Sequence, residues 1–456
     1  MKKFFRYPLQ ITRNIAVIIL MMLLSNIPTI NAATLPSSYD LRDYDRVTSV
    51  KNQGIPGPCW AFAAVGAMES NYITQKLNTN KTMPDLSELQ IAFYCYKDPK
   101  PERNFTSEHK SGILNLEGNI FMPIAFMSRL SGPTDEKNLR YNTQLSYNEK
   151  MSLAKKAPES FKRSMRLREA YFLSGISTPD KNLRKELIMK HGAIAVSIYS
   201  ELMKYHTHDK YYTYYNPDHG TETNHLVVIV GWDDNFSRNN FMPKPQHNGA
   251  WLIKNSWGTM RGTNEGYFWM SYDQHIYGGT AFITERYNSR LKHYGYDDLG
   301  WCSTVNYSWG ANVFKIESDK ERLKEAAFYT PTNNMSYELY IYDLGDKLPS
   351  SPVSKKLIAS KNGTIKYAGY HTVNILNSNN KNDAITMTKG KYFSVVLNLS
   401  SNNQAGKQAI ETKINNYSEN ALVHANESYF SKDGKHWTDG MNINSNACIK
   451  AFTLTR

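Results

Sequence analysis

One cysteine of this 456-residue chain stands where a nucleophile could be held. Cys59 directly precedes Trp60 at the start of an apolar run with helical spacing. A helix N-terminus and a neighbouring imidazolium both lower the pKa of a thiol, and the thiolate is the reactive form. Cys59 is therefore either a small buried residue or a nucleophile held at the start of a helix.

A histidine and an asparagine could supply the other groups that such a nucleophile needs. His225 begins the run HLVVIVGW, and a general base on a rigid strand keeps its geometry. Asn255 lies in WLIKNSWG, and its amide can accept the imidazole N–H without adding charge. An aromatic ring such as Trp257 over that contact would exclude water. Taken singly, a histidine that begins a strand is more often structural, and Asn-Ser-Trp-Gly is more often a turn.

These residues need a helix and several strands to position them. Apolar residues at helical spacing predict a helix from Cys59 to about Gln75. The runs at 192–200 and 225–232 are β-branched and bounded by glycine, which predicts buried strands. The basic stretch at 142–168 is expected to be a surface excursion.

Taken together, these motifs resemble the papain family of cysteine proteases. The resemblance covers roughly residues 35–285, and the order Gln, Cys, His, Asn is the family's order. It implies an α+β chain whose residues 34–290 form a papain-like, two-lobed protease domain. The segments that carry it are YDLRDYDRVTSVKNQGIPGPCWAFAAVGAMES (39–70), LSELQIAFYC (86–95), TNHLVVIVGW and WLIKNSWG.

The resemblance assigns a role to each matching residue. Cys59 would be the nucleophile, His225 the acid and base, and Asn255 the group that orients His225. Gln53 would donate its side-chain amide to the oxyanion, beside the backbone N–H of Cys59. Trp257 would shield the His–Asn contact and line the substrate site. The implied reaction is endopeptidase cleavage of proteins or peptides through a thioester, with no cofactor required and no metal ligand in the site.

The chain departs from the family pattern at several places. Pro56 replaces the family's first cysteine, so Cys95, which resembles its usual partner, is expected to be a reduced, buried thiol. The glycine pair that lines the family's cleft appears as Glu117-Gly118, which leaves Gly118 as the predicted substrate contact. The 166 residues from Cys59 to His225 exceed the family's approximate 130–150. We expect the extra residues after Tyr141 and in the tyrosine-rich loop 205–224, which would border the cleft.

The first 33 residues have the pattern of a secretory signal peptide. A basic start precedes the short apolar run Ile15 to Leu24, and small residues follow it at Ala32 and Ala33. The alternative is an uncleaved membrane anchor; no other run is long enough to span a bilayer. Because the mature-like sequence begins almost at the predicted cleavage site, control by a long prosegment is not expected. Activity on export, or control by the second domain, is expected instead.

The charge of the chain bears on its partners. Without the four cations of residues 1–33 the net charge of +13 falls to +9, which suits contact with anionic cell-wall polymers. No basic motif is dense enough to predict nucleic-acid binding. We expect a secreted, extracellular protein, associated with the cell surface non-covalently if at all, because no sorting signal closes the sequence.

The second half reads as β-rich. Short strands are predicted at 337–344, 371–376 and 392–399, with a hairpin turn at Asn362-Gly363 and a helix-like piece at 319–327. Residues 291–456 resemble the lectin-like β-sandwich domain found beside papain-type proteases in secreted clostridial proteins. The name implies binding of cell-wall or surface glycans, but a fold resemblance does not establish a ligand.

Three details of this second domain stay open in the sequence. Trp301, Trp309 and Trp437 could stack on sugars, although core positions are the favoured interpretation. Cys302 and Cys448 could pair or stay free. The adjacent acids Asp297 and Asp298 could help to bind Ca²⁺.

Other functions compete with the endopeptidase interpretation. A glycan-binding adhesin on a residual protease scaffold would be expected to lack one of the four site residues, and all four are present. A cysteine acyltransferase or amidase could use the same groups, because they specify acyl transfer rather than the acyl donor. An exopeptidase is a further alternative.

Overall fold

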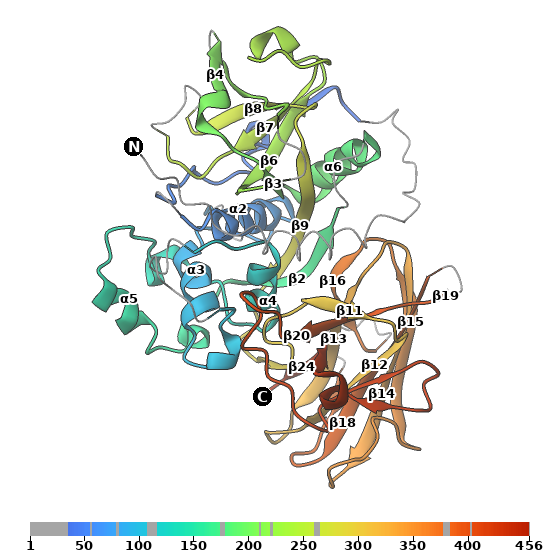
Figure 1. Ribbon diagram of the computed structural model, residues 1–456. Coiled ribbons are helices and arrows are strands. Elements are labelled where there is room, and N and C mark those ends of the chain that lie inside the picture. The colour runs from blue at the N-terminus through green and yellow to red at the C-terminus, as the bar shows by residue number, and fades with distance from the viewer. Residues whose placement is uncertain are drawn as a thin grey trace.

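The computed structural model describes residues 35–54, 57–78, 82–106, 116–173, 178–208, 211–218, 222–259, 265–376, 384–401 and 404–455. The predicted signal peptide lies outside these residues. Figure 1 shows an N-terminal part in which most helices lie together below the strands and one helix lies apart beside them, and a C-terminal part made almost wholly of strands. The chain is therefore a mixed α+β fold followed by a β-rich domain.

The N-terminal part, residues 35–286, divides into a helical lobe and a β lobe. Its helices are α2 (Cys59–Thr74), α3 (Glu88–Lys97), α4 (Phe121–Ser128), α5 (Tyr147–Leu153) and α6 (Thr178–His191). Its strands are β1 (Ser38–Asp40), β2 (Met165–Phe172), β3 (Ile194–Ile198), β4 (Tyr205–His208), β5 (Tyr211–Tyr214), β6 (His225–Asp233), β7 (Ala250–Lys254), β8 (Tyr267–Ser271) and β9 (Ile276–Arg286).

Helix α2 lies between the two lobes. Every residue from Trp60 to Tyr72 is buried, as expected of a helix that is apolar on all sides. It packs against α3 on one side and against β3, β6 and β9 on the other. Gly66 faces β6, where a Cβ would lie at an ordinary contact distance of 3.5 Å from Val228. The predicted helix and the two predicted strands are confirmed.

The C-terminal part begins at residue 291 and consists of strands. They are β10 (Leu291–Tyr294), β11 (Ser303–Val305), β12 (Trp309–Lys315), β13 (Arg322–Thr330), β14 (Met335–Gly345), β15 (Leu357–Ile365), β16 (Gly369–Asn374), β17 (Ile385–Thr386), β18 (Tyr392–Ser401), β19 (Gln404–Ala405), β20 (Gln408–Thr412), β21 (Ser428–Ser431), β22 (Thr438–Asp439), β23 (Ser445–Ala447) and β24 (Ile449–Leu454). One sheet has the order β15-β14-β18-β12-β21-β22. Its inner side chains meet those of β13 and β24 in one apolar cluster that includes Phe314, Phe328, Leu339 and Val395, which makes this part a β-sandwich.

The two parts share one sheet. Its order is β10-β24-β13-β16-β2-β9-β3-β6-β7-β8-β5-β4, and β16 of the C-terminal part pairs with β2 of the N-terminal part. In that pair Gly369 faces Tyr171 and Tyr370 faces Ala170. One apolar cluster also runs through the junction, joining Trp60 and Phe126 to Trp301 and Tyr329. The C-terminal part therefore packs on the helical lobe as an extension of the same fold.

Two local predictions for the C-terminal part are wrong. The helix-like piece at 319–327 is mostly strand β13, because it pairs with β16 and β24 and its charged Glu325 is buried in an ion pair. The Asn362-Gly363 pair lies inside β15 rather than in a hairpin turn. Gly363 is needed there because a Cβ would lie 2.9 Å from the ring of Tyr337.

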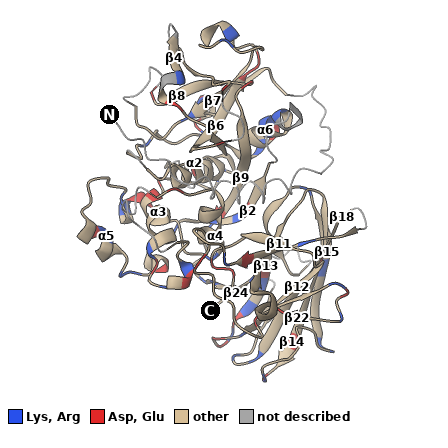
Figure 2. Cartoon of the chain, viewed as in Figure 1, with Lys and Arg blue, Asp and Glu red and all other residues tan. Residues whose placement is uncertain are grey.

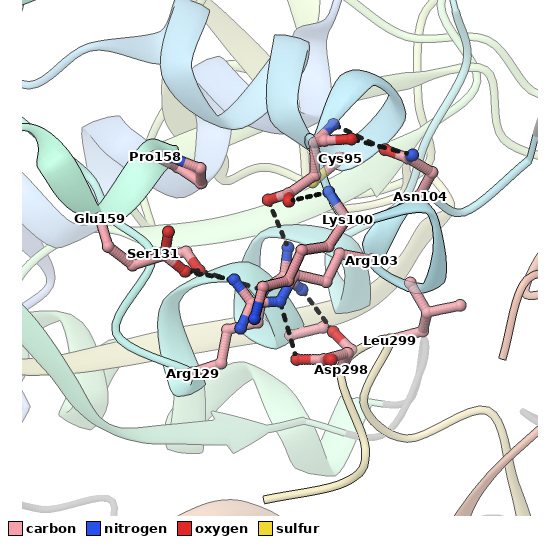
Figure 3. Close-up of polar contacts among 12 residues, drawn as sticks. Cys95, Lys100, Arg103, Asn104, Arg129, Ser131, Pro158, Glu159, Asp298 and Leu299 are labelled. Atoms are coloured by element: carbon pink, nitrogen blue, oxygen red, sulfur yellow. Dashed lines mark hydrogen bonds and ion pairs between the residues drawn. The ribbon is translucent and has the colours of Figure 1, made fainter. Parts of the chain in front are cut away.

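A polar network also crosses the junction (Figure 3). The buried Arg129 guanidinium donates to the backbone carbonyl of Asp298 and, at 3.1 Å, to the hydroxyl of Ser131. Arg103 lies 3.3 Å from the Asp298 carboxylate and also pairs with Glu159. Arginine from the helical lobe thus fixes the loop that opens the C-terminal part.

The predicted thiols and tryptophans take several environments. All four cysteines are free, so Cys302 and Cys448 are not paired, and Cys95 is buried as expected. Trp301 is a core residue that packs between Phe121, Phe172 and Tyr329. Trp309 and Trp437 are half-buried on the outer face of the second sheet.

Figure 2 shows both signs of charge on both parts of the chain, with Lys and Arg gathered along α6. No helix among the described residues is long and apolar enough to cross a bilayer.

Candidate active site

The thiol of Cys59 lies at the junction of helix α2 and strand β6. Cys59 is the first residue of α2, and Pro58 before it offers no side-chain cap to the helix N-terminus. The backbone N–H of Leu226, the second residue of β6, donates to Sγ at 3.5 Å. Cys59 as a whole residue is partly exposed.

His225 and Asn255 meet on neighbouring strands. His225 is the first residue of β6, Asn255 directly follows β7, and these two strands are paired. Nε2 of His225 lies 2.9 Å from Oδ1 of Asn255. That Oδ1 also accepts the backbone N–H of Ser256 at 2.8 Å, which fixes the amide orientation. Because Oδ1 can only accept, Nε2 carries the proton and Nδ1 is the ring nitrogen able to act as a base.

The ring of Trp257 covers this contact. It stacks on the His225 ring with a centroid distance of 4.9 Å and an interplanar angle of 24°. Tyr205 packs edge-on against Trp257 at 5.6 Å; it begins β4, which pairs with β5, so this part of the predicted tyrosine-rich loop is a strand pair. The two rings keep water from the His–Asn contact, and Tyr205 borders the site.

Gln53 lies beside the start of α2. Its Oε1 accepts the hydroxyl of Ser256, so its Nε2 points the other way, toward Gly57 O at 3.3 Å. The backbone N–H of Cys59 donates to the same Gly57 carbonyl at 2.9 Å. The two predicted oxyanion donors therefore converge on one acceptor, and a substrate oxyanion must compete with that carbonyl for them.

Burial opposes charge on both reacting groups. It raises the pKa of the Cys59 thiol to about 11, and the carboxylate of Glu117 acts in the same direction. It lowers the pKa of His225 to about 4, against the effect of the Asn255 hydrogen bond. The site without substrate thus favours a neutral thiol beside a neutral imidazole.

Gly118 packs against the ring that follows the nucleophile. A Cβ on Gly118 would lie 2.6 Å from the indole of Trp60, so only glycine fits without displacing one of them. The Trp60 Nε1–H donates to Leu116 O at 3.4 Å, and the Tyr96 hydroxyl donates to Glu117 O. The side chains of Trp60, in the first turn of α2, and Tyr96, in α3, thus hold the segment 116–118 by bonding to its backbone carbonyls.

Sequence reasoning missed two residues that hold Gln53. Ser256 bonds its side chain, and the Tyr141 hydroxyl donates to its backbone carbonyl at 2.7 Å. Ser256 could have been suspected from the sequence, because it is the next residue after the predicted site residue Asn255. Tyr141 could not have been found in this way, because it lies 88 residues from Gln53 in the sequence.

The predicted Ca²⁺ ligands already have cationic partners from this chain. The Asp297 carboxylate contacts the ammonium of Lys450, and Asp298 contacts Arg103. A lysine ammonium in contact with Asp297 does not fit a calcium ion at the same carboxylate. Among the described residues no three His, Cys, Asp or Glu side chains gather as a metal site. A calcium requirement stays a prediction.

A cysteine at a helix N-terminus, whose sulfur accepts the N–H of the residue after the histidine of a histidine–asparagine pair, is the arrangement of a two-lobed thiol enzyme. The chain belongs to the papain family of cysteine proteases, whose family model matches residues 35–287. A second model, described as a lectin-like domain, matches residues 293–453.

Individual relatives are similar to this chain over its first domain. The viral cathepsin of Heliothis zea nuclear polyhedrosis virus is 30% identical over 235 residues, 50% of this chain and 51% of that protein. The probable cysteine protease RD19B of Arabidopsis thaliana is 28% identical over 259 residues, 56% of this chain and 64% of that protein. The chain spans about half to two thirds of the length of these curated relatives.

Two solved structures share both domains. One is the clostridial cysteine protease Cwp84 after propeptide cleavage, 26% identical, with a TM-score of 0.76 over 92% of this chain and 100% of that one. The other holds the cysteine protease and lectin-like domains of Cwp84, a surface layer associated protein of Clostridium difficile. It is 24% identical, with a TM-score of 0.78 over 95% of this chain and 91% of that one, and shows the shared fold.

Proposed function

We propose that the protein is a cysteine endopeptidase that hydrolyses proteins or peptides through a thioester on Cys59. One observation carries the proposal: the His225–Asn255 pair, fixed at 2.9 Å, begins the strand whose next backbone N–H touches the Cys59 sulfur. Membership of the papain family supports the same reaction.

The first half of the reaction forms the thioester. Nδ1 of His225 takes the thiol proton, and the thiolate attacks the carbonyl carbon of the scissile peptide bond. The oxyanion replaces the Gly57 carbonyl as acceptor for the Cys59 N–H and Gln53 Nε2. The C–N bond then breaks, and the leaving amine takes the proton from His225.

The second half restores the enzyme. His225 takes a proton from water as the water oxygen attacks the thioester carbonyl. The C–S bond breaks, the carboxylic acid product leaves, and the thiolate regains its proton from the imidazolium. Asn255 keeps Nε2 protonated throughout, so the same ring nitrogen serves both steps.

Active-site labelling tests this proposal. We expect an epoxide inhibitor of papain-type enzymes to modify Cys59 of the purified, reduced chain, residues 34–456, and Cys59→Ala to abolish cleavage of a mixed peptide library. Cys95→Ala is the matched control, because that thiol is fully buried and out of reach of the inhibitor, and it should keep both activities. A folded wild-type chain that neither labels nor cleaves would refute the proposal. Release of an acyl product other than a peptide carboxylate would favour an acyltransferase or amidase.

We propose that the lectin-like domain binds a surface or cell-wall glycan and that the protein works outside the cell. Half-buried aromatic rings on the outer sheet face support this, since such rings stack on sugars: Trp309 and Tyr340 stack at 6.0 Å, with Trp437 at their edge. The surface-layer association of Cwp84 and the predicted signal peptide point the same way. We expect the purified chain to bind to a glycan array. The double variant Trp309→Ala and Trp437→Ala should lose this binding. Equal binding by the variant would refute the assignment of this face.

A further inference from the structure

We propose that Tyr417, a residue of the lectin-like domain, positions the substrate-contacting segment 116–119 of the protease domain. This inference rests on the proposed function, because it assigns Tyr417 to the cleft of the same site. The lectin-like domain then shapes the substrate cleft directly, besides any glycan that it binds.

Residues 116–119, called the cleft segment below, are held at three positions by residues of the protease domain. Trp60 and Tyr96 hold the carbonyls of Leu116 and Glu117, and Gly118 lies against the Trp60 ring. These contacts come from helices α2 and α3. None of the four cysteines forms a disulfide that could anchor it. The last residue of the segment, Asn119, is held within the protease domain by the Met122 N–H, which donates to its backbone carbonyl at 3.3 Å, and it has a further contact from the lectin-like domain.

Tyr417 reaches Asn119 across the domain junction. Its hydroxyl donates to Oδ1 of Asn119 at 3.4 Å, and the same oxygen accepts the backbone N–H of Phe121 at 2.9 Å. Asn119 thereby ties the end of the cleft segment to the start of α4. Burial raises the pKa of the Tyr417 phenol well above its ordinary value, so the hydroxyl stays a donor at neutral pH.

Tyr417 and its neighbours also contact residues 104–106 of the protease domain, which precede the cleft segment in the sequence. The Tyr417 ring packs on Phe105 with a centroid distance of 5.2 Å. Thr106 donates its hydroxyl to the Glu419 carboxylate at 2.9 Å, and the side chain of Asn420 donates to Asn104 O at 3.0 Å. Three residues of the lectin-like domain thus contact the protease chain just before the segment 116–119, at residues 104–106, and at its last residue, Asn119: Tyr417, Glu419 and Asn420.

The segment 417–420 is itself fixed within its own domain. The Ser418 hydroxyl donates to Thr412 O at 2.6 Å, and Ala421 is fully buried. Asn446 donates to Leu422 O at 2.8 Å and to the Glu411 carboxylate at 2.8 Å. Because residues 417–420 bond both to their own domain and to the protease domain, the position of the β-sandwich determines where they hold Asn119.

The positioning role predicts a change in binding without a change in chemistry. Tyr417→Phe keeps the ring on Phe105 and removes only the hydroxyl. We expect it to raise KM for peptides that fill the cleft by about 2- to 10-fold, the effect of one lost neutral hydrogen bond, with kcat within twofold. Alkylation of Cys59 by iodoacetamide, which does not fill the cleft, should keep its rate.

Tyr296→Phe is the matched control. Its hydroxyl also donates to a carbonyl, that of Val313, but inside the β-sandwich, so KM should not change. A double-mutant cycle with Asn119→Ala should show non-additive effects on KM, because both substitutions remove the same contact. An unchanged KM in Tyr417→Phe, or a loss confined to kcat, would overturn the inference.

Hydrogen exchange separates this inference from the proposed function. The backbone amides of 116–122 should exchange faster in Tyr417→Phe than in the wild type or in Tyr296→Phe. A wild-type chain without peptidase activity would reject the proposed function, and the exchange comparison would still test the contact. Equal exchange in all three proteins would overturn the positioning role even in an active enzyme.

Discussion

Arg166 of the protease domain and Glu325 of the lectin-like domain form an ion pair at 2.5 Å in which both side chains are only 1% exposed. Arg166 also pairs with Glu285 at the end of β9. The pair lies beside the β2–β16 contact that joins the two domains into one sheet. A buried charge shared between domains makes each domain depend on the other for stability.

Removing one partner of this pair should be costly. We expect Arg166→Ala to lower the free energy of unfolding of the whole chain by up to about 3–5 kcal/mol, because the buried Glu325 would keep only the more distant Arg168, at 3.4 Å, and Lys324, at 3.5 Å. Urea denaturation measures this. Lys137→Ala, in an ion pair whose lysine is 78% exposed, should change it by less than about 1 kcal/mol. Arg166→Met combined with Glu325→Leu should recover much of the loss; a small effect of Arg166→Ala alone would contradict the dependence.

The orientation of Gln53 should matter for the chemical step. Gln53→Ala removes an oxyanion donor, and we expect kcat to fall by about 100- to 1000-fold. Ser256→Ala leaves the donor in place but frees its amide to rotate, so a loss of about 2- to 10-fold is expected. Steady-state peptide cleavage measures both. Ser164→Ala, at an exposed hydroxyl, is the control; equal losses at 256 and 164 would argue against the orienting role.

Substitution of Gly118 should impair substrate binding. A Cβ there would lie 2.6 Å from the Trp60 ring, so Gly118→Ala must displace the cleft segment, and KM should rise at least tenfold. Gly66→Ala places its Cβ in ordinary contact, 3.5 Å from Val228, and should leave KM unchanged. The same KM for both variants would mean that Gly118 does not line the bound substrate.

His225 and His191 should each contribute a loss of stability on acidification between about pH 6.5 and 4. Burial lowers the pKa of both His225 and His191 to about 4 in the fold, whereas an unfolded histidine takes up its proton near 6.5. The unfolded chain therefore binds more protons in this window, and the free energy of unfolding decreases as the pH falls. Thermal unfolding at several pH values measures the slope. His225→Gln and His191→Gln should each flatten it; slopes equal to the wild type would contradict the buried neutral state.

Much of the site could be predicted from local sequence. The helix from Cys59, the strand from His225 and the position of Asn255 after another strand each depend on a short run with clear apolar periodicity. The family's order of Gln, Cys, His and Asn then indicated which side chains belong together. Local sequence could not show that Ser256 holds the Gln53 amide, since the two are 203 residues apart.

The errors fall where distant partners overrode local propensity. The charged run at 319–327 has helical character by itself. It forms strand β13 instead, where Glu325 pairs with Arg166, which lies 159 residues away in the sequence. The Asn362-Gly363 pair suits a turn, yet its glycine is there to make room for Tyr337 on the paired strand. Neither partner can be seen from the run itself.

The sequence by itself determined the reactive groups, the elements that carry them and the two-domain organisation, because these follow from residue type and short-range periodicity. Only the tertiary structure decided how the domains are joined. The shared sheet, the Arg166–Glu325 pair and the contact of Tyr417 with Asn119, 298 residues apart, all arise from pairing between distant segments. Such pairing depends on the packing of the complete fold and leaves no periodic signal in either segment alone.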